Sequence, residues 1–112
     1  MNLPVIYKYI LDVTAIILLL LIYTYILSGY GLIKSEISEY TAGLLNYRLS
    51  IILHLNPILR IALIISAMLH GITGFTLMCY RVRNKLYRRS LVIIVHLLFS
   101  SLTIYLLILE FT

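Results

Sequence analysis

Three long stretches of the chain contain no ionisable carboxylate, lysine or arginine. They run from Val13 to Ile33, from Ile61 to Tyr80 and from Ser90 to Leu109, and comprise 21, 20 and 20 residues. A helix needs about 20 residues to cross a hydrocarbon core of about 30 Å, and a backbone in lipid must form its hydrogen bonds internally. The pattern therefore predicts three transmembrane helices, at about 13–33, 58–80 and 90–109.

The composition agrees with this pattern, because 62% of the 112 residues are hydrophobic, 12% are charged and the mean hydropathy is +1.07. These values exclude an ordinary soluble domain. The first stretch is too long for the apolar core of a signal peptide, only Lys8 precedes it as a basic residue, and no small-residue cleavage site follows. We therefore predict an all-α membrane protein in which residues 1–112 form a single three-helix transmembrane domain.

The basic residues predict the orientation of the helices. The second connection carries five cations and no acidic residue: Arg81, Arg83, Lys85, Arg88 and Arg89. Short loops of this kind stay in the cytoplasm, so we expect the N-terminus inside and the C-terminus outside. The net charge of +5 is then mainly a topology signal. Anionic lipid headgroups account for it, and nucleic acid is not expected as a partner, because a short turn between lipid-embedded helices has little reach.

The first connection is longer and holds an amphipathic segment, Leu44–Leu55. This segment predicts an interfacial helix at the outer membrane surface, and Asn56-Pro57 should end it and start the second span. Arg60 and Glu110 fall at the outer boundaries of their spans. We expect their side chains to reach the aqueous interface, and no further role is required of them.

Two histidines lie inside the predicted membrane spans. His70 precedes Arg81 by 11 residues and His96 follows Arg89 by 7, which places them about 16 Å and about 10 Å deep by helical rise. An ionisable residue in the membrane indicates a functional site by default, because an unpaired polar group in hydrocarbon is costly. Neutral imidazole is a common axial ligand of haem iron, so both histidines are candidate metal ligands.

A row of small residues shares a helix face with His70. Ala62, Ser66, His70 and Gly74 follow one another at intervals of four. Small residues on either side of a histidine would let a flat macrocycle approach the backbone, but the same row fits plain helix–helix packing. Haem ligation, a hydrogen-bonded packing histidine and a proton-relay or transport role remain open. Ion translocation would need a carboxylate inside a window, and none of the three windows holds one.

The third histidine and the one cysteine suggest less. His54 precedes His70 by sixteen residues, a rotation of about 160° that predicts opposite helix faces and disfavours a dihaem cytochrome. We expect His54 to lie near the headgroups. Cys79 is the only cysteine, so an intrachain disulfide is excluded and a small packing residue is expected.

The stretch Leu69–Phe75, with its His-x-x-x-Gly pattern in a second span ahead of a basic inner loop, resembles the membrane anchor (cytochrome b) subunits of succinate dehydrogenase and fumarate reductase. The resemblance implies that His70 is an axial ligand of a b-type haem, which is often shared between two small anchor subunits. It also implies flavoprotein and iron–sulfur subunits held at the membrane and a quinone bound near the inner surface.

The chain departs from the pattern of that family in two places. Arg81 stands where the family commonly has an aspartate, although Tyr80 precedes it. The serine and arginine of the family's first-span quinone site have no clear counterpart between Tyr7 and Thr14. The quinone site therefore rests on Tyr80 alone, while Arg81 and Arg83 are the candidate partners of the haem propionates.

These inferences predict a haem-b-binding anchor subunit of a respiratory oxidoreductase in the plasma membrane. It would pass electrons between a peripheral iron–sulfur subunit and membrane quinone without being catalytic by itself. His70 would bind iron together with His96 or with a histidine of a partner chain. The alternative is a cofactor-free accessory subunit that stabilises a larger membrane complex. Either function requires partner subunits, because three thin helices bury little surface on their own.

Overall fold

The computed structural model describes residues 2–112 and is helical almost throughout. Its helices are α1 (Leu3–Ile33), α2 (Ile37–Tyr40), α3 (Tyr47–Leu55), α4 (Pro57–Cys79) and α5 (Lys85–Phe111). Three of them, α1, α4 and α5, are long and apolar enough to cross a membrane. The prediction of an all-α membrane protein with three transmembrane helices is confirmed. Orientation across the membrane stays a prediction.

Each long helix starts at a residue suited to that position. Asn56 accepts hydrogen bonds from the amides of Ile58 and Leu59 and precedes Pro57, the first residue of α4. Asn84 caps α5 in the same way. The helices α1 and α5 begin earlier than the predicted spans, at Leu3 and Lys85, because ionisable residues limit the hydrocarbon window and not the helix.

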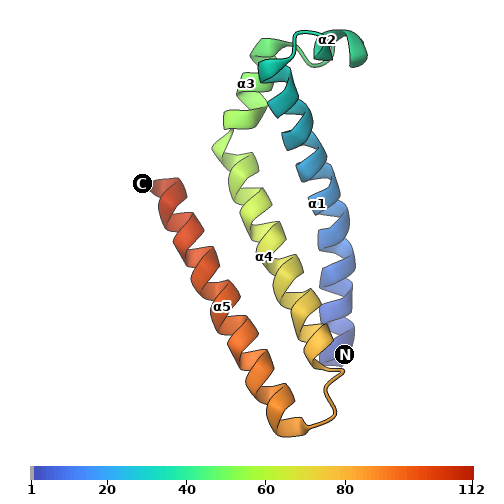
Figure 1. Cartoon of the computed structure of the whole chain (residues 1–112), viewed down its shortest axis with the longest axis vertical. Coiled ribbons are helices and arrows are strands. Elements are labelled where there is room, and N and C mark those ends of the chain that lie inside the picture. The colour runs from blue at the N-terminus through green and yellow to red at the C-terminus, as the bar shows by residue number, and fades with distance from the viewer. Residues whose placement is uncertain (1) are drawn as a thin grey trace.

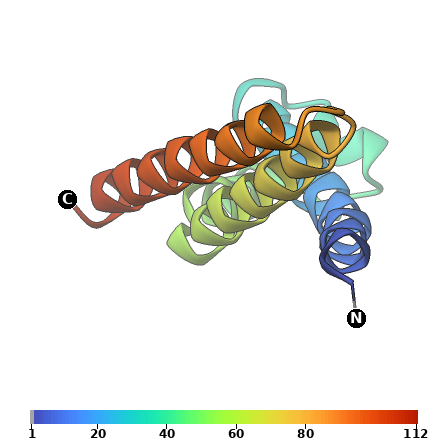
Figure 2. The same ribbon diagram turned by 90° about the horizontal axis from the view of Figure 1, so that it is seen from below.

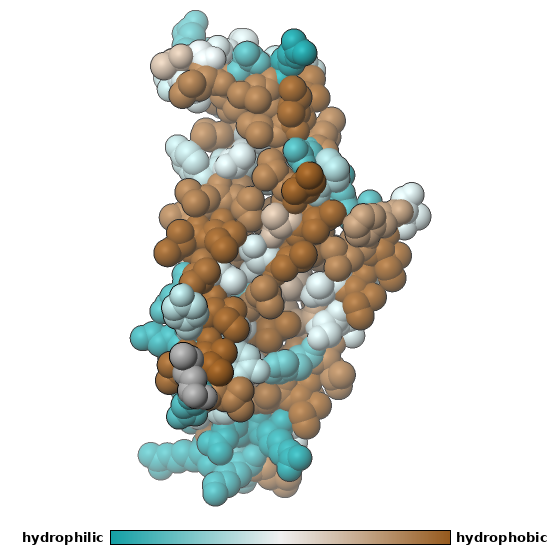
Figure 3. All heavy atoms as spheres, turned by 180° about the vertical axis from the view of Figure 1, so that it is seen from behind, coloured by the Kyte–Doolittle hydropathy of each residue, from teal (hydrophilic) through white to brown (hydrophobic). Residues whose placement is uncertain are grey.

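The helix α4 lies between α1 and α5, and both neighbours run antiparallel to it (Figures 1 and 2). The molecule is 55 Å long. Apolar side chains dominate the surface over the middle of the long helices, and hydrophilic residues gather at the ends (Figure 3). We call the end with the 80–84 connection the inner end, following the predicted topology, and the end with α2 and α3 the outer end.

The helix α3 continues along α1 beyond the outer end of α4 (Figure 1). Ser50 of α3 is fully buried, and a Cβ at Gly31 of α1 would overlap its side chain. The predicted amphipathic helix therefore exists, beginning at Tyr47 rather than Leu44. It packs lengthwise on α1, and its location at the membrane surface stays a prediction.

An ion pair joins α4 and α5 at the outer end. The guanidinium of Arg60 donates to the carboxylate of Glu110 from Nε (3.0 Å to Oε2) and from Nη2 (2.6 Å to Oε1). Arg60 Nη1 also donates to the carbonyl of Leu55, at 3.0 Å. The sequence predicted the outer location of both residues but not their pairing, which arises because the antiparallel helices bring both charges to one level. Arg60 and Arg81 are 21 positions apart in the sequence, which corresponds to about 30 Å along a helix. The Arg60–Glu110 pair and the basic loop therefore lie on opposite sides of a layer of about that thickness.

Gly71 allows α4 and α5 to pack closely, because a Cβ there would overlap the ring of Phe99. We expect Gly71→Ala to destabilise the chain in detergent by about 1–3 kcal/mol through overpacking. Gly29→Ala is the matched control: its Cβ would lie 3.4 Å from His54 Cε1, an ordinary contact, and alanine improves helix propensity. Equal stability of the two variants in unfolding titrations would contradict this packing role.

Candidate functional site

His70 of α4 pairs with Thr14 of α1 in the middle of the bundle. The Thr14 hydroxyl lies 3.1 Å from His70 Nδ1 and 2.7 Å from the carbonyl of Ile10. A carbonyl only accepts, so the single hydroxyl proton goes to Ile10 and the Thr14 oxygen accepts from Nδ1–H. This assignment leaves the lone pair of the neutral imidazole on Nε2.

The Nε2 atom of His70 has no hydrogen-bond partner in the described part of the chain. It is not buried either: between residues 2 and 112, the buried polar side-chain atoms without a partner are Tyr25 Oη and Thr76 Oγ1. His70 is half-buried. The arrangement therefore presents an imidazole lone pair, at membrane depth, to whatever lies beside the chain.

The row of small residues around His70 faces α1. Thr14 contacts His70, a Cβ on Gly74 would lie 3.4 Å from Leu11 Cδ1, and Ser66 is 8% exposed. Of the two uses predicted for this row, approach of a macrocycle and helix–helix packing, the contacts within the chain match the second, because α1 lies against His70 and Gly74. Helix–helix packing, the alternative use of such a row, accounts for Ser66 and Gly74. A macrocycle on His70 would have to lie at the chain surface beside Nε2.

Both nitrogens of His96 have partners. Nδ1 lies 2.8 Å from the carbonyl of Val92 and must carry the proton, so Nε2 accepts from the hydroxyl of Tyr7 at 3.0 Å. No hydrogen bond or ring contact joins His96 to His70 in residues 2–112. The structure brings both histidines to α1 but does not bring them to each other. His96 could bind iron only after its bond to Tyr7 is broken.

The other predicted site residues lie at the inner end. The Tyr80 ring is 6.5 Å from that of Tyr7, centroid to centroid. Arg81 and Arg83 are exposed and form no ion pair with residues 2–112. Cys79 is buried and fills a packing position. The structure thus groups Tyr7, Tyr80 and His96 near the basic loop, about one-third of the bilayer away from His70.

His54 repeats the arrangement of His70, which was not predicted from the sequence. Ser28 Oγ lies 3.1 Å from His54 Nδ1 and donates to the carbonyl of Tyr25 at 3.0 Å. The break at Asn56 resets the helix phase, so His54 and His70 both face α1 instead of opposite sides. His54 lies beyond Arg60, toward the outer end, where a histidine near headgroups was expected.

Three hydroxyl residues on one face of α1 therefore each bond a histidine: Tyr7 with His96, Thr14 with His70 and Ser28 with His54. Their spacing by multiples of seven keeps them on one side of a helix. This spacing is visible in the sequence and would have identified the face of α1 that packs inward.

Asp12 lies deeper than the sequence suggested. Its neighbours Leu11 and Thr14 contact Gly74 and His70, so Asp12 lies beside the inner half of α4, about 12 Å along the helix axis from the level of Arg81. It is exposed and has no ion-pair partner in the described chain. Asp12 stays outside the three uncharged windows of the sequence, but its level beside α4 was not expected, because α1 is shifted outward relative to α4. A carboxylate there requires a donor or cation from outside the chain, or access to water.

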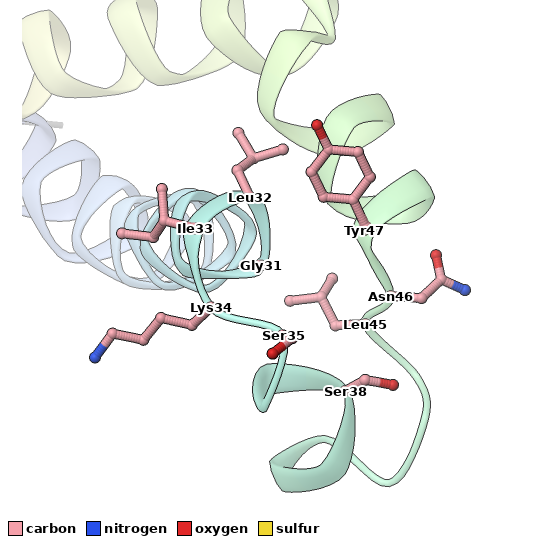
Figure 4. Close-up of a pocket in the computed structure, with 9 residues that line it drawn as sticks. All are labelled: Gly31, Leu32, Ile33, Lys34, Ser35, Ser38, Leu45, Asn46 and Tyr47. Atoms are coloured by element: carbon pink, nitrogen blue, oxygen red, sulfur yellow. The ribbon is translucent and has the colours of Figure 1, made fainter.

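A depression between the outer end of α1, α2 and the start of α3 is lined by Gly31, Lys34, Ser38, Asn46 and neighbouring residues (Figure 4). The Lys34 ammonium lies over the Tyr30 ring, 5.4 Å from its centroid. Asn46 is occupied in capping α3. This depression brings no acid–base pair together.

Within residues 2–112, no three His, Cys, Asp or Glu side chains are close enough to hold a metal ion together. A metal would therefore need a ligand set that the chain does not complete by itself, as a haem or a second protein chain could supply. In comparisons with known proteins, no family profile, curated protein or solved structure matches this chain at a significant level.

Proposed function

We propose that the chain is a haem-b-binding membrane anchor subunit of a respiratory oxidoreductase of the succinate dehydrogenase type, located in the plasma membrane. The observation that carries the proposal is the environment of His70: its Nδ1 lies 3.1 Å from the Thr14 hydroxyl, and its Nε2 has no hydrogen-bond partner in residues 2–112 and is not fully buried. The resemblance of Leu69–Phe75 to the family's ligand motif supports the same residue.

A histidine that binds a metal through Nε2 usually donates its Nδ1 proton to a neighbouring acceptor, which fixes the tautomer and the ring orientation. Thr14 provides that acceptor at 3.1 Å, and it is 6% exposed and held by its own helix backbone. His70 is thus oriented for ligation before any metal arrives. When bound, a haem would supply one-electron transfer, while the protein would set its potential through ligand identity and burial.

The haem would be held between this chain and a partner subunit. His70 opens to the chain surface, and His96 has both nitrogens engaged. We therefore favour a histidine of the second anchor subunit as the other axial ligand over His96. The exposed carboxylate of Asp12 at span depth supports a protein neighbour there, since lipid alone offers it no cation.

The inner end is the proposed place for quinone and for the peripheral iron–sulfur and flavoprotein subunits. Tyr7 and Tyr80 lie together there, and the Tyr7 hydroxyl is bonded to His96. Phenol and imidazole groups can donate and accept the protons of quinone reduction. Arg81 and Arg83 remain the proposed partners of the haem propionates.

A cofactor-free accessory subunit is the second candidate. It is favoured by the fact that α1 covers the small-residue row and that all three histidines bond hydroxyls of α1. In this case the histidines would serve to hold the helices together. The free Nε2 of His70 would then meet a polar group of a neighbouring subunit.

The two functions differ in one measurable property of the assembly. A complex purified through this chain should show reducible b-type absorption bands, with the electron paramagnetic resonance signature of low-spin, doubly His-ligated iron. A complex that purifies intact and contains no haem would contradict the anchor function and leave the accessory function.

A further inference from the structure

A depression lies between the inner end of α4 and the first turns of α5. Its lining residues are Tyr80, Lys85, Arg88, Arg89, Val92 and Ile93. Lys85 lies one turn before the adjacent pair Arg88 and Arg89 on α5, and the two aliphatic residues follow on the next turn toward the middle of the helix. The depression is therefore cationic at its inner rim and apolar on its membrane side.

The cations of the depression have no anionic partner in the chain. Residues 2–112 contain one ion pair, Arg60–Glu110, and no side-chain hydrogen bond involves Lys85, Arg88 or Arg89. The sequence has no acidic residue between Glu39 and Glu110. Three unpaired cations at the start of a helix also oppose its dipole, which favours negative charge there.

We propose that this depression binds one anionic phospholipid. Arg88, Arg89 and Lys85 would hold the phosphate, and an acyl chain would lie along Val92 and Ile93. Asn84 already caps the amides of Leu86 and Tyr87, so side chains and not the helix terminus would bind the phosphate. A free phosphate would leave the apolar part of the depression unused, which is why a lipid is the fitting source of the anion.

The proposal does not depend on haem binding. It assigns lipid binding to the residues that line this depression and not to the basic loop as a whole. Arg81 and Arg83 carry the same charge but do not line the depression. A loop that merely attracts an anionic membrane surface would use all five cations alike. A built site would depend on Arg88 and Arg89 and not on Arg81 and Arg83.

The test uses the full chain in vesicles of phosphatidylcholine with and without phosphatidylglycerol, and native mass spectrometry of retained lipid after detergent extraction. We expect the wild-type chain to retain one phosphatidylglycerol. Arg88→Gln with Arg89→Gln should weaken retention about 30-fold, since each lost cation is worth about 5-fold. The charge-matched double variant Arg81→Gln with Arg83→Gln should retain the lipid like the wild type.

Three results would overturn the proposal. Equal loss of lipid in both double variants would mean diffuse attraction to the loop. Displacement of the lipid by inorganic phosphate alone would mean an anion site without a lipid. Retention of phosphatidylcholine and phosphatidylglycerol in the proportions of the vesicle would mean no specific binding. Circular dichroism of each variant checks that its helices are intact, and Ile93→Ser should weaken retention while leaving all charges in place.

Discussion

Replacing His70 by alanine is expected to remove the b-type absorption bands of the assembled complex completely. His70 is the histidine at membrane depth whose Nε2 is free at the chain surface, and alanine offers iron no ligand. The chain itself should still insert, because the loss of one imidazole leaves all three apolar helices long enough to span. The measurement is the reduced-minus-oxidised difference spectrum, normalised to the amount of this chain in the membrane.

His54→Ala is the matched control for that experiment. His54 has the same bond from Nδ1 to a hydroxyl of α1, at 3.1 Å, but lies toward the outer end beyond Arg60. We expect its loss to leave the spectrum unchanged. His96→Ala then tests the second ligand: a retained spectrum would support a partner's histidine, and a lost low-spin signal would support His96. Persistence of the full spectrum in His70→Ala would refute the ligand assignment.

Replacing Thr14 by valine is expected to weaken haem binding about 10- to 100-fold, the usual effect of losing the group that orients a metal-binding histidine. Valine keeps the shape of threonine but cannot accept a hydrogen bond from Nδ1–H, so His70 loses the contact that fixes its tautomer. Thr14 is almost fully buried. Because valine has nearly the same shape, we expect the packing of α1 against α4 to change little. The measurement is haem retention during washing with a competing haem-binding protein, together with the midpoint potential.

Two further variants make the Thr14 result specific. Thr14→Ser keeps the hydroxyl and should restore most of the haem affinity. Thr24→Val removes a hydroxyl of the same helix that bonds its own backbone, at 2.8 Å, and contacts no histidine. It should have no effect. An equal loss of haem in Thr24→Val and Thr14→Val would point to a general weakening of α1 packing instead of a lost hydrogen bond.

The helices were predictable because a bilayer imposes a simple rule on the sequence. Runs without charge located all three spans, and Asn56-Pro57 located the start of α4 to the residue. The helix ends beyond the windows were not predictable, since Lys8 and Asp12 are helical although they lie outside the uncharged run. Charged residues indicate where the hydrocarbon layer ends, whereas capping residues indicate where the helix ends.

The relative positions of the helices were not predictable from span lengths. Treating each uncharged window as one bilayer placed Asp12 at the membrane boundary, but the pairs Thr14–His70 and Leu11–Gly74 place it between the levels of His70 and Gly74 on α4. The same shift puts the outer part of α1 beside α3. The register of α1 against its neighbours depends on which of their side chains contact one another. The spacing of the hydroxyl residues of α1 carries this information, and hydropathy does not measure it.

The prediction that His54 and His70 lie on opposite helix faces was wrong for a related reason. A rotation of 100° per residue holds only within one continuous helix, and Asn56 interrupts it with an extended backbone (φ −66°, ψ 117°). His54 therefore faces α1 like His70. A hydrogen-bonded His70 was one of the alternatives that the sequence left open, and its partner on α1, Thr14, could be known only from the packing.

The central claim is that His70 Nε2 binds the iron of a haem shared with a neighbouring subunit. A density map of the purified assembly tests it most directly. We expect a porphyrin at the surface of α4, with its iron bound to His70 Nε2 and with Thr14 still hydrogen-bonded to Nδ1. Density showing only lipid tails or a partner's polar side chain against that nitrogen would contradict it.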